Sequence, residues 1–455
     1  MAGGVVAVLA LGVIYGNRVY TAIVDLWHGY TAEPIERVHV ELLSAWLLSR
    51  AKAAGAGPEE EAFEELLDAL DEGGIPELRA IAEDLREETQ RRGYEKDDAL
   101  AGHLTAWNEA LDRAGAPFVI RGGALESPRG PQLFITSGRT LHDGVVDVGS
   151  QTVRVRVIER VDDMNIRESV LGENVEVAQG GLLLSDRVLE FAIDRIWPIL
   201  DPQAKPTAWS ATMVDAVRAE VRRDLSPESY AVLEDLAGAR LAAVEAALAT
   251  QSRRKCSGFL FPRVGWRGVS PRDRDVLRRH VSAKDCPDVT EQEFEAVRTF
   301  TDRASAEPDL EEAVGALLAW SLRPIALHEG RHAADVEVTG SLLEPVPCSA
   351  CGDLSDRAKN ELSAYAAEFA WTSAPAMAAY QVCLAIAGSG GSHRSAIEFL
   401  FDELDGDCVS GLPDQATVRA FEKRAFARDQ PMALREAFPG SIPIPPRARA
   451  LSDGR

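Results

Sequence analysis

The spacing of apolar residues changes twice along the chain, and this change restricts the fold more than any other feature. Up to residue 116, leucine and alanine recur every three or four residues among acidic ones, as in residues 59–70, which is typical of amphipathic helices. From residue 117 the period is two, and Val153, Val155 and Val157 alternate with arginines as in a strand. Helical spacing returns near residue 187. The pattern predicts an α+β fold, predominantly helical, with a small antiparallel β region after an N-terminal helical segment.

Turn-forming residues and shifts in composition divide the chain into six segments. Pro58 suits the start of a helix, and Gly73-Gly74 suits its end. The predicted segments are a hydrophobic N-terminal stretch (1–24), a helical region (25–116), a β-rich region (117–200), a helical region with irregular structure and short helices (201–308), a strongly helical region (309–430) and a proline-rich tail (431–455). We expect the end of the tail, from Phe438 on, to be extended or disordered.

The N-terminal segment carries an unbroken run of apolar residues and glycine over residues 5–15, and the apolar trend continues to Val24. A span from Gly3 to Val24 is long enough to cross a bilayer, with Arg18 close enough to one end to reach the interface. No basic residue precedes the run and no clear cleavage site follows it, which argues against a cleaved signal peptide. We therefore expect an uncleaved membrane anchor, with a buried strand or helix as the alternative.

Charge and cysteine content restrict the partners and the compartment. The chain has 49 basic and 72 acidic residues and a net charge of −23, which argues against nucleic acid as a partner. Its six cysteines permit three disulfides in an exported protein or six thiols in a cytoplasmic one. Cys348 and Cys351 form a CxxC pair without a second such pair, which favours a local disulfide over a zinc ribbon or a redox motif.

The chemistry of the chain is indicated by the sequence His328-Glu329-Gly-Arg-His332, which is an HExxH motif. On a helix, two histidines four residues apart lie on one face and can bind the same Zn²⁺. Glu329 lies beside them, where its carboxylate can take a proton from a water that the metal acidifies. With 8 histidines and 72 acids in 455 residues, chance produces about 0.02 such motifs per chain. We place the motif on a helix with Pro324 in its first turn and Thr339-Gly340 at its end.

A catalytic zinc site needs a third protein ligand, and the sequence offers two main candidates. Glu361 follows Asn360 in a helical run that starts near Ser355, and Glu368 lies two turns further on. Glu361 is favoured and Glu368 remains open, while Glu337 and Glu344 are weaker alternatives.

An HExxH motif, a connecting loop and an Asn-Glu pair on a second helix resemble the gluzincin metallopeptidases over residues 315–375. The resemblance implies a zincin-like helical region with Zn²⁺ bound by His328, His332 and Glu361, and with Glu329 as general base. Two positions depart from the family pattern: Arg331 is charged, and Tyr365 stands where thermolysin-like enzymes have an aspartate that orients the first histidine. Asp335 is a candidate for that orienting partner.

Cleavage of a peptide also requires a donor to the oxyanion, for which Tyr365, Tyr380 and His393 are candidates. The predicted function is thus a zinc-dependent metallopeptidase that acts on a peptide or protein. A zinc-binding scaffold without turnover, recruiting Cys348 or Cys351 as a further ligand, is the main alternative, and a metallohydrolase of other substrates is a third. With the predicted anchor, we expect a bacterial-type inner-membrane protein whose catalytic region is extracytoplasmic, although the few flanking charges leave the orientation open.

Overall fold

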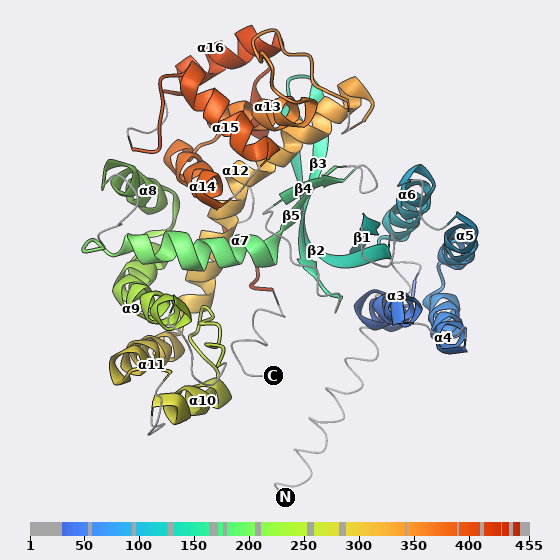
Figure 1. Ribbon diagram of the computed structural model, residues 1–455, viewed down its shortest axis with the longest axis horizontal. Coiled ribbons are helices and arrows are strands. Elements are labelled where there is room, and N and C mark those ends of the chain that lie inside the picture. The colour runs from blue at the N-terminus through green and yellow to red at the C-terminus, as the bar shows by residue number, and fades with distance from the viewer. Residues whose placement is uncertain are drawn as a thin grey trace, which may run out of the picture. The chain divides into compact units, whose positions relative to one another are not determined.

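The computed structural model of the chain describes residues 30–52, 57–92, 97–125, 132–162, 172–175, 180–204, 211–252, 259–281, 288–341, 344–388, 391–409, 414–428, 430–435 and 440–445 (Figure 1). These residues form two compact units. Unit 1 takes in the described residues within 1–140, 158–168 and 175–179, and unit 2 takes in those within 141–157, 169–174 and 180–455. Each unit has its own cluster of buried apolar side chains. The architecture confirms the predicted α+β class with helices predominating.

Unit 1 is built from helices that bury one apolar face each. Its helices are α2 (Ala32–Arg37), the π-helix η1 (Val38–Leu42), α3 (Leu43–Lys52), α4 (Gly57–Gly73), α5 (Pro76–Arg92) and α6 (Asp97–Ala114). The end of α4 agrees with the sequence, because Gly74 adopts a positive φ of 75° that favours glycine. Trp46, Phe63 and Trp107 lie in the core. The side chain of Asn108 joins α6 to the first strand through hydrogen bonds of 2.8 Å to the N–H and the carbonyl of Ile120.

The β region forms one sheet of six strands. The strands are β1 (Phe118–Leu125), β2 (Gln132–Val148), β3 (Gln151–Arg160), β4 (Gly172–Val175), β5 (Gly180–Leu184) and β6 (Met432–Leu434). The order is β1-β2-β3-β5-β4, and β6 also pairs with β2. β1 pairs antiparallel with β2, with Phe118 opposite Arg139, and β6 pairs antiparallel with the far end of β2, with Met432 opposite Val148. β6 lies outside the predicted β-rich region, in the predicted proline-rich tail (431–455).

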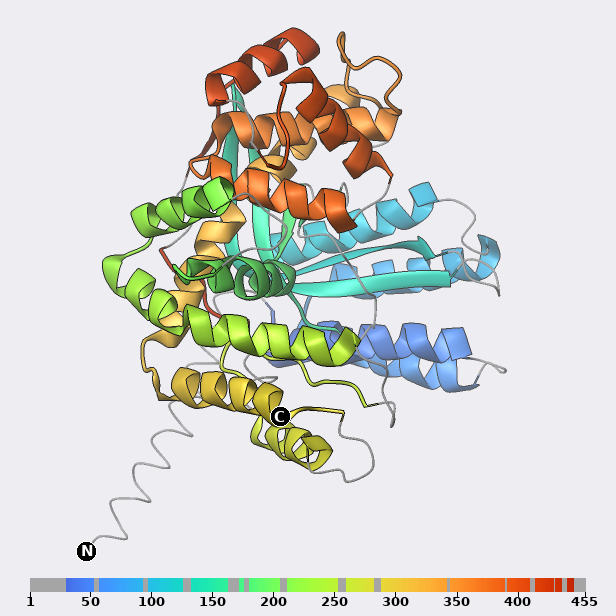
Figure 2. The ribbon, with the colours of Figure 1, turned by 60° about the vertical axis from the view of Figure 1, so that its left-hand side comes forward.

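The helices of unit 2 lie between β5 and β6 in the sequence. They are α7 (Ser185–Phe191), the π-helix η3 (Ala192–Ile196), the 3-10 helix η4 (Trp197–Leu200), α8 (Ala211–Asp224), α9 (Pro227–Ser252), α10 (Pro271–Val281), α11 (Glu291–Ala306), α12 (Leu310–Thr339), α13 (Asp356–Trp371), α14 (Pro375–Gly388), α15 (Ser392–Glu403) and α16 (Gln415–Phe426). In Figure 2, α9 and α11 lie side by side. α11 is longer and more regular than predicted, because Thr290 and Glu293 form a capping box at its start.

The longest helix, α12, carries the HExxH motif and packs against β5, α9 and α13. The predicted end is confirmed, since Gly340 follows it in the left-handed conformation with φ of 87°. The predicted start is wrong, because α12 begins at Leu310 and Pro324 lies inside it. A proline within a helix removes a backbone hydrogen bond. The side chains of α12 are buried almost without interruption from Leu310 to Asp335, and we attribute the continuation of the helix past Pro324 to this burial.

Among the described residues of unit 2, four cysteines form two disulfides. Cys348 pairs with Cys351 in the loop between α12 and α13, as the CxxC spacing predicts, and Cys383 of α14 pairs with Cys408. Cys256 and Cys286 lie outside the described residues. The predicted membrane anchor at residues 1–24 lies outside them too, and none of the helices that are described combines the length and the apolar character needed to cross a bilayer.

Candidate metal centre

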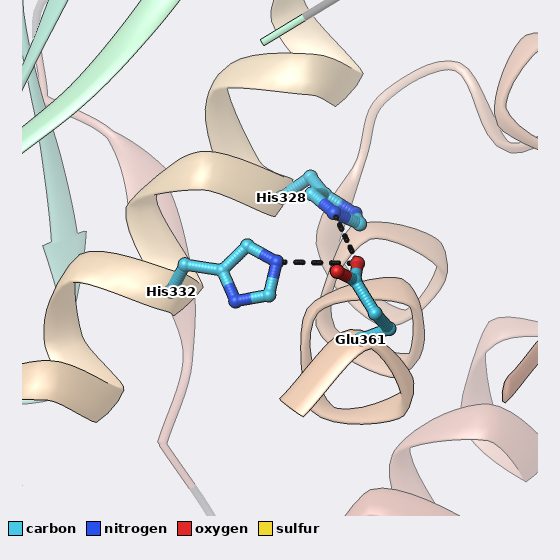
Figure 3. A group of neighbouring side chains, drawn as sticks. All are labelled: His328, His332 and Glu361. Carbon is cyan, nitrogen blue, oxygen red and sulfur yellow. Dashed lines mark ion pairs between the residues drawn. The ribbon is translucent and has the colours of Figure 1, made fainter. Parts of the chain in front are cut away.

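The two histidines of the motif lie on one face of α12, about one helical turn apart. Their ring centroids are 4.9 Å apart, and both side chains are buried. Gly330 lies between them and faces the sheet, where an added Cβ would come within 3.0 Å of the side chain of Val146. The glycine therefore permits a close approach of the helix to β2. Figure 3 shows both imidazoles turned toward Glu361.

Glu361 reaches the histidines from the first turns of α13. Ser355 begins this helix, accepting a hydrogen bond from the N–H of Ala358 at 3.3 Å, which agrees with the predicted start. Asn360 fixes the adjoining loop, since its side chain accepts from the N–H of Val346 at 2.8 Å and donates to the carbonyl of Glu344 at 3.2 Å. The residue before the carboxylate thus anchors the connection from α12.

The distances around Glu361 fit a metal ion. Its Oε2 atom lies 3.6 Å from Nε2 of His328 and 3.5 Å from Nε2 of His332. Two atoms bound to a tetrahedral zinc are about 3.4 Å apart, whereas a charged hydrogen bond is about 2.8 Å long. Nδ1 of His393 is 3.1 Å from the same oxygen as well, although no contact of this buried oxygen in the described part of the chain has the angles of a hydrogen bond. The nitrogen, nitrogen and oxygen donors of His328, His332 and Glu361 all lie within 4.8 Å of one another and could hold one divalent ion.

Glu368 lies on the opposite side of His328 from Glu361. Its Oε2 atom is 3.2 Å from Nδ1 of His328, while Glu361 faces Nε2 of the same ring. A metal-binding histidine usually donates its other N–H to a carboxylate, which fixes its tautomer and orientation. Glu368 thus suits the orienting role, and Glu361 suits the ligand role, for which the sequence had left both open. A spacing of seven residues puts both carboxylates on one face of α13.

Burial and neighbouring charges shift the acid–base equilibria of the cluster in the absence of metal. Burial opposes the ionisation of Glu361, but three imidazoles hold the pKa of its carboxyl well below the usual range. Burial also opposes protonation of His328, yet Glu361 and Glu368 raise the pKa of its imidazole to about 10. Burial raises the pKa of Glu329, and Glu361 adds to this effect against the opposing charges of His328 and His332. A metal ion at Nε2 of His328 would compete with protonation of that ring.

Glu329 is buried beside the cluster, close to β5. An added Cβ on Gly181 would lie 2.8 Å from the Cβ of Glu329, so the backbone of the strand touches the helix at the motif. This contact could not be predicted from the sequence, because residues 180–184 carry only a glycine pair and three leucines.

Two of the three predicted oxyanion donors adjoin the cluster. The hydroxyl of Tyr365 lies 3.1 Å from Nδ1 of His393, and that nitrogen lies 3.1 Å from Oε2 of Glu361. Tyr365 is buried on α13 and packs against the ring of His328, with 4.6 Å between centroids, whereas His393 is about one-third exposed in the first turn of α15. The third candidate is not part of the group, because the hydroxyl of Tyr380 donates to the carbonyl of Arg195 at 3.4 Å.

The remaining candidates lie outside the metal-binding group. Glu337 is exposed near the end of α12, and Glu344 lies in the loop after it. Asp335 is buried but bonds to Ser363 and Arg428, and Glu368 is the carboxylate hydrogen-bonded to the ligand histidine. The Cys348–Cys351 disulfide leaves neither sulfur as a thiolate ligand.

The arrangement brings together three metal-ligand side chains, a buried carboxylate and two groups that can carry a proton. A site of this kind can bind one divalent ion with a coordination position left over and can move a proton next to it. Comparisons of the chain with protein-family models, with curated proteins and with solved structures yield no match.

Proposed function

We propose that the chain is a zinc-dependent metallopeptidase with a zincin-like site in unit 2. The observation that carries the proposal is the buried Oε2 of Glu361, which lies at metal-ligand spacing from Nε2 of both histidines. The order of HExxH helix, loop and second helix with a glutamate supports the gluzincin type. The proposed partner is a peptide or protein substrate.

His328, His332 and Glu361 would hold the ion, and Glu368 would keep His328 in the tautomer whose Nε2 is free to bind it. When bound, zinc supplies a Lewis acid that polarises a carbonyl and makes a water molecule more acidic. With three protein ligands, one position remains for water or substrate.

Glu329 performs the proton transfers. In the ionised state its carboxylate takes one proton from the attacking water as the new carbon–oxygen bond forms. It then gives this proton to the leaving nitrogen as the carbon–nitrogen bond breaks. Burial raises the pKa of Glu329, which suits a group that must hold the proton between the two steps.

Tyr365 and His393 stabilise the negative charge that develops on the carbonyl oxygen. The two side chains are within hydrogen-bond distance of each other at the edge of the cluster, so both can turn a polar hydrogen toward the same substrate atom. His393, which is partly exposed, also lies where a substrate can enter.

Zinc content and cleavage of a fluorogenic peptide library by the full chain test this proposal. We expect Glu329→Gln to keep the metal and to lower kcat about 10²- to 10⁴-fold, because only the proton transfer is lost. We expect His332→Ala to lose metal and cleavage together.

A matched control is Glu337→Gln, which makes the same change on an exposed part of the same helix and should leave cleavage unaltered. Cleavage by Glu329→Gln at the rate of the unaltered chain would contradict the proposal. A chain that retains no zinc after dialysis against a submicromolar zinc buffer would contradict it as well.

A further inference from the structure

Next to the histidines, α12 carries two buried charges that are bound by the C-terminal part of the chain. Arg331 donates to Glu422 of α16 at 2.9 Å. Asp335, one turn on, pairs with Arg428 at 2.6 Å. The side chains of Arg331, Asp335 and Glu422 are almost fully buried, and that of Arg428 is 12% exposed. We call these four residues the charge network.

The charge network also forms hydrogen bonds to α13, the helix that carries Glu361. Ser363 donates to Asp335 at 2.7 Å and accepts from Arg428 at 3.0 Å. Trp371, at the end of α13, donates to the second oxygen of Glu422 at 3.0 Å. The charge network therefore connects both metal-ligand helices to α16 and to the residue two positions beyond its end.

Stability alone is a weak reason for such a network. Burying four charges has a desolvation cost of several kcal/mol per ion, and apolar replacements of buried ion pairs are often neutral or stabilising. Hydrogen-bonded charges differ from apolar contacts in that they fix direction and distance. The observed geometry thus suits a role in orientation.

The metal site is sensitive to the orientation of α12. Arg331 lies three residues after His328 and directly before His332, so a rotation of the helix moves all three side chains together. A rotation of about 10° displaces an atom about 6 Å from the helix axis by about 1 Å. Metal–ligand distances tolerate only about 0.2 Å. A small rotation of α12 would therefore separate the histidines from Glu361.

We infer that Glu422 and Arg428 are positioning residues of the metal centre, which hold α12 through Arg331 and Asp335 in the rotation that aligns His328 and His332 with Glu361. This role rests on the proposed function only in requiring that the three ligands bind a metal. It assigns to the C-terminal segment 415–428 a part in metal binding although none of its side chains belongs to the ligand group.

Co²⁺ binding to the full chain separates positioning from stability. In the double variant Arg331→Met/Glu422→Met, we expect a thermal unfolding temperature at or above that of the unaltered chain. We also expect Co²⁺ affinity to fall about 10- to 100-fold, with shifted visible absorption bands. Arg428→Met should weaken Co²⁺ binding in the same way, and Arg428→Lys should restore it.

The control is Glu403→Gln, which removes an exposed ion pair between α15 and Arg424 of α16 and should change neither measurement. If the double variant fails to fold, the same Co²⁺ titration of Glu422→Gln, which keeps the shape of the side chain, tests the positioning role instead. If the folded variants keep the Co²⁺ affinity and the visible absorption bands of the unaltered chain, the positioning role is overturned and the proposed function is not. Failure of the unaltered chain to bind Co²⁺ overturns both this role and the proposed function.

Discussion

At the scale of single residues, His39 in the core of unit 1 is held in its neutral form. Its Nδ1 lies 2.8 Å from the carbonyl of Ile35, and its Nε2 accepts a hydrogen bond from Trp107 at 3.3 Å. The ring is stacked on Phe118 with 4.6 Å between centroids. A proton on Nε2 would face the N–H of Trp107. Burial lowers the pKa of His39 to about 4, against a smaller opposite effect of the bond to Ile35.

This pKa predicts a loss of stability in acid. The unfolded chain binds a proton on His39 below about pH 6.5, while the folded unit binds it only near pH 4, so acid favours the unfolded state. Between pH 7.5 and pH 4, we expect His39 to remove about 3 kcal/mol from the free energy of unfolding of unit 1. Urea unfolding measures this free energy when hydrogen exchange in peptides of α3 and α6 is used to follow unit 1.

The reference for this measurement is His39→Leu, which has no group to titrate. The stability advantage of the unaltered chain over this variant should shrink by about 3 kcal/mol as the pH falls from 7.5 to 4. An advantage that stays constant over this range would show that His39 does not titrate on unfolding.

Residue patterns in the sequence indicated the three candidate ligands that the structure brings together, but less of their surroundings. The spacing of His328 and His332 implies a shared face in any helix, and Glu361 could be named from its helical context. The division of roles between Glu361 and Glu368 could not, because both lie on one face of α13 and only the position of His328 between them separates ligand from orienting partner. Glu422 lies 90 residues beyond His332, and no local pattern connects them.

At the scale of elements, the contact between β5 and α12 sets the position of the proposed general base. An added Cβ on Gly181 would lie 2.8 Å from the Cβ and 3.4 Å from the carbonyl carbon of Glu329. Either the strand or the helix must therefore move to accept a side chain.

We expect Gly181→Ala to lower the free energy of unfolding by about 1–3 kcal/mol and to reduce kcat, because Glu329 is displaced. The affinity for zinc should change less than kcat, because the proposed ligands are side chains of α12 and α13 other than Glu329. Equilibrium unfolding, zinc competition and peptide cleavage measure the three quantities.

The comparison for this variant is Gly102→Ala in α6, where an added Cβ has nothing within 4 Å. Alanine should stabilise that helix by up to about 1 kcal/mol and leave cleavage unaltered. Full activity in Gly181→Ala would mean that the strand shifts to accept the added Cβ and that Glu329 keeps its position.

The elements that the sequence predicted are those with strong local signals. The helix start at Ser355 and the helix ends at Gly74 and Gly340 follow from capping rules. The start of α12 was misread because Pro324 is a strong local signal for a helix start, whereas the burial of residues 310–335 is a tertiary effect. β6 has only three residues, and its pairing with β2 across nearly 300 residues leaves no periodicity to read.

At the scale of the whole molecule, the chain has two hydrophobic cores. The core of unit 1 is formed by helices α2–α6 with Phe118, Ile120 and Ile135 of the sheet, and the core of unit 2 includes the buried length of α12. The three candidate metal ligands, His328, His332 and Glu361, all belong to unit 2. A ligand that binds only a folded unit stabilises that unit by mass action. Metal binding and the titration of His39 should therefore act on different parts of the chain.

We predict two separable unfolding transitions in urea, assigned by hydrogen exchange to peptides of α6 and of α13. Zinc at about 100 times its dissociation constant should stabilise the transition of α13 by about 2.7 kcal/mol and leave that of α6 in place. His332→Ala should abolish the shift, while His39→Leu should move only the transition of α6. A single transition that responds to both zinc and His39→Leu would mean that the two cores unfold as one cooperative body, and the metal centre would then depend on the integrity of unit 1 as well.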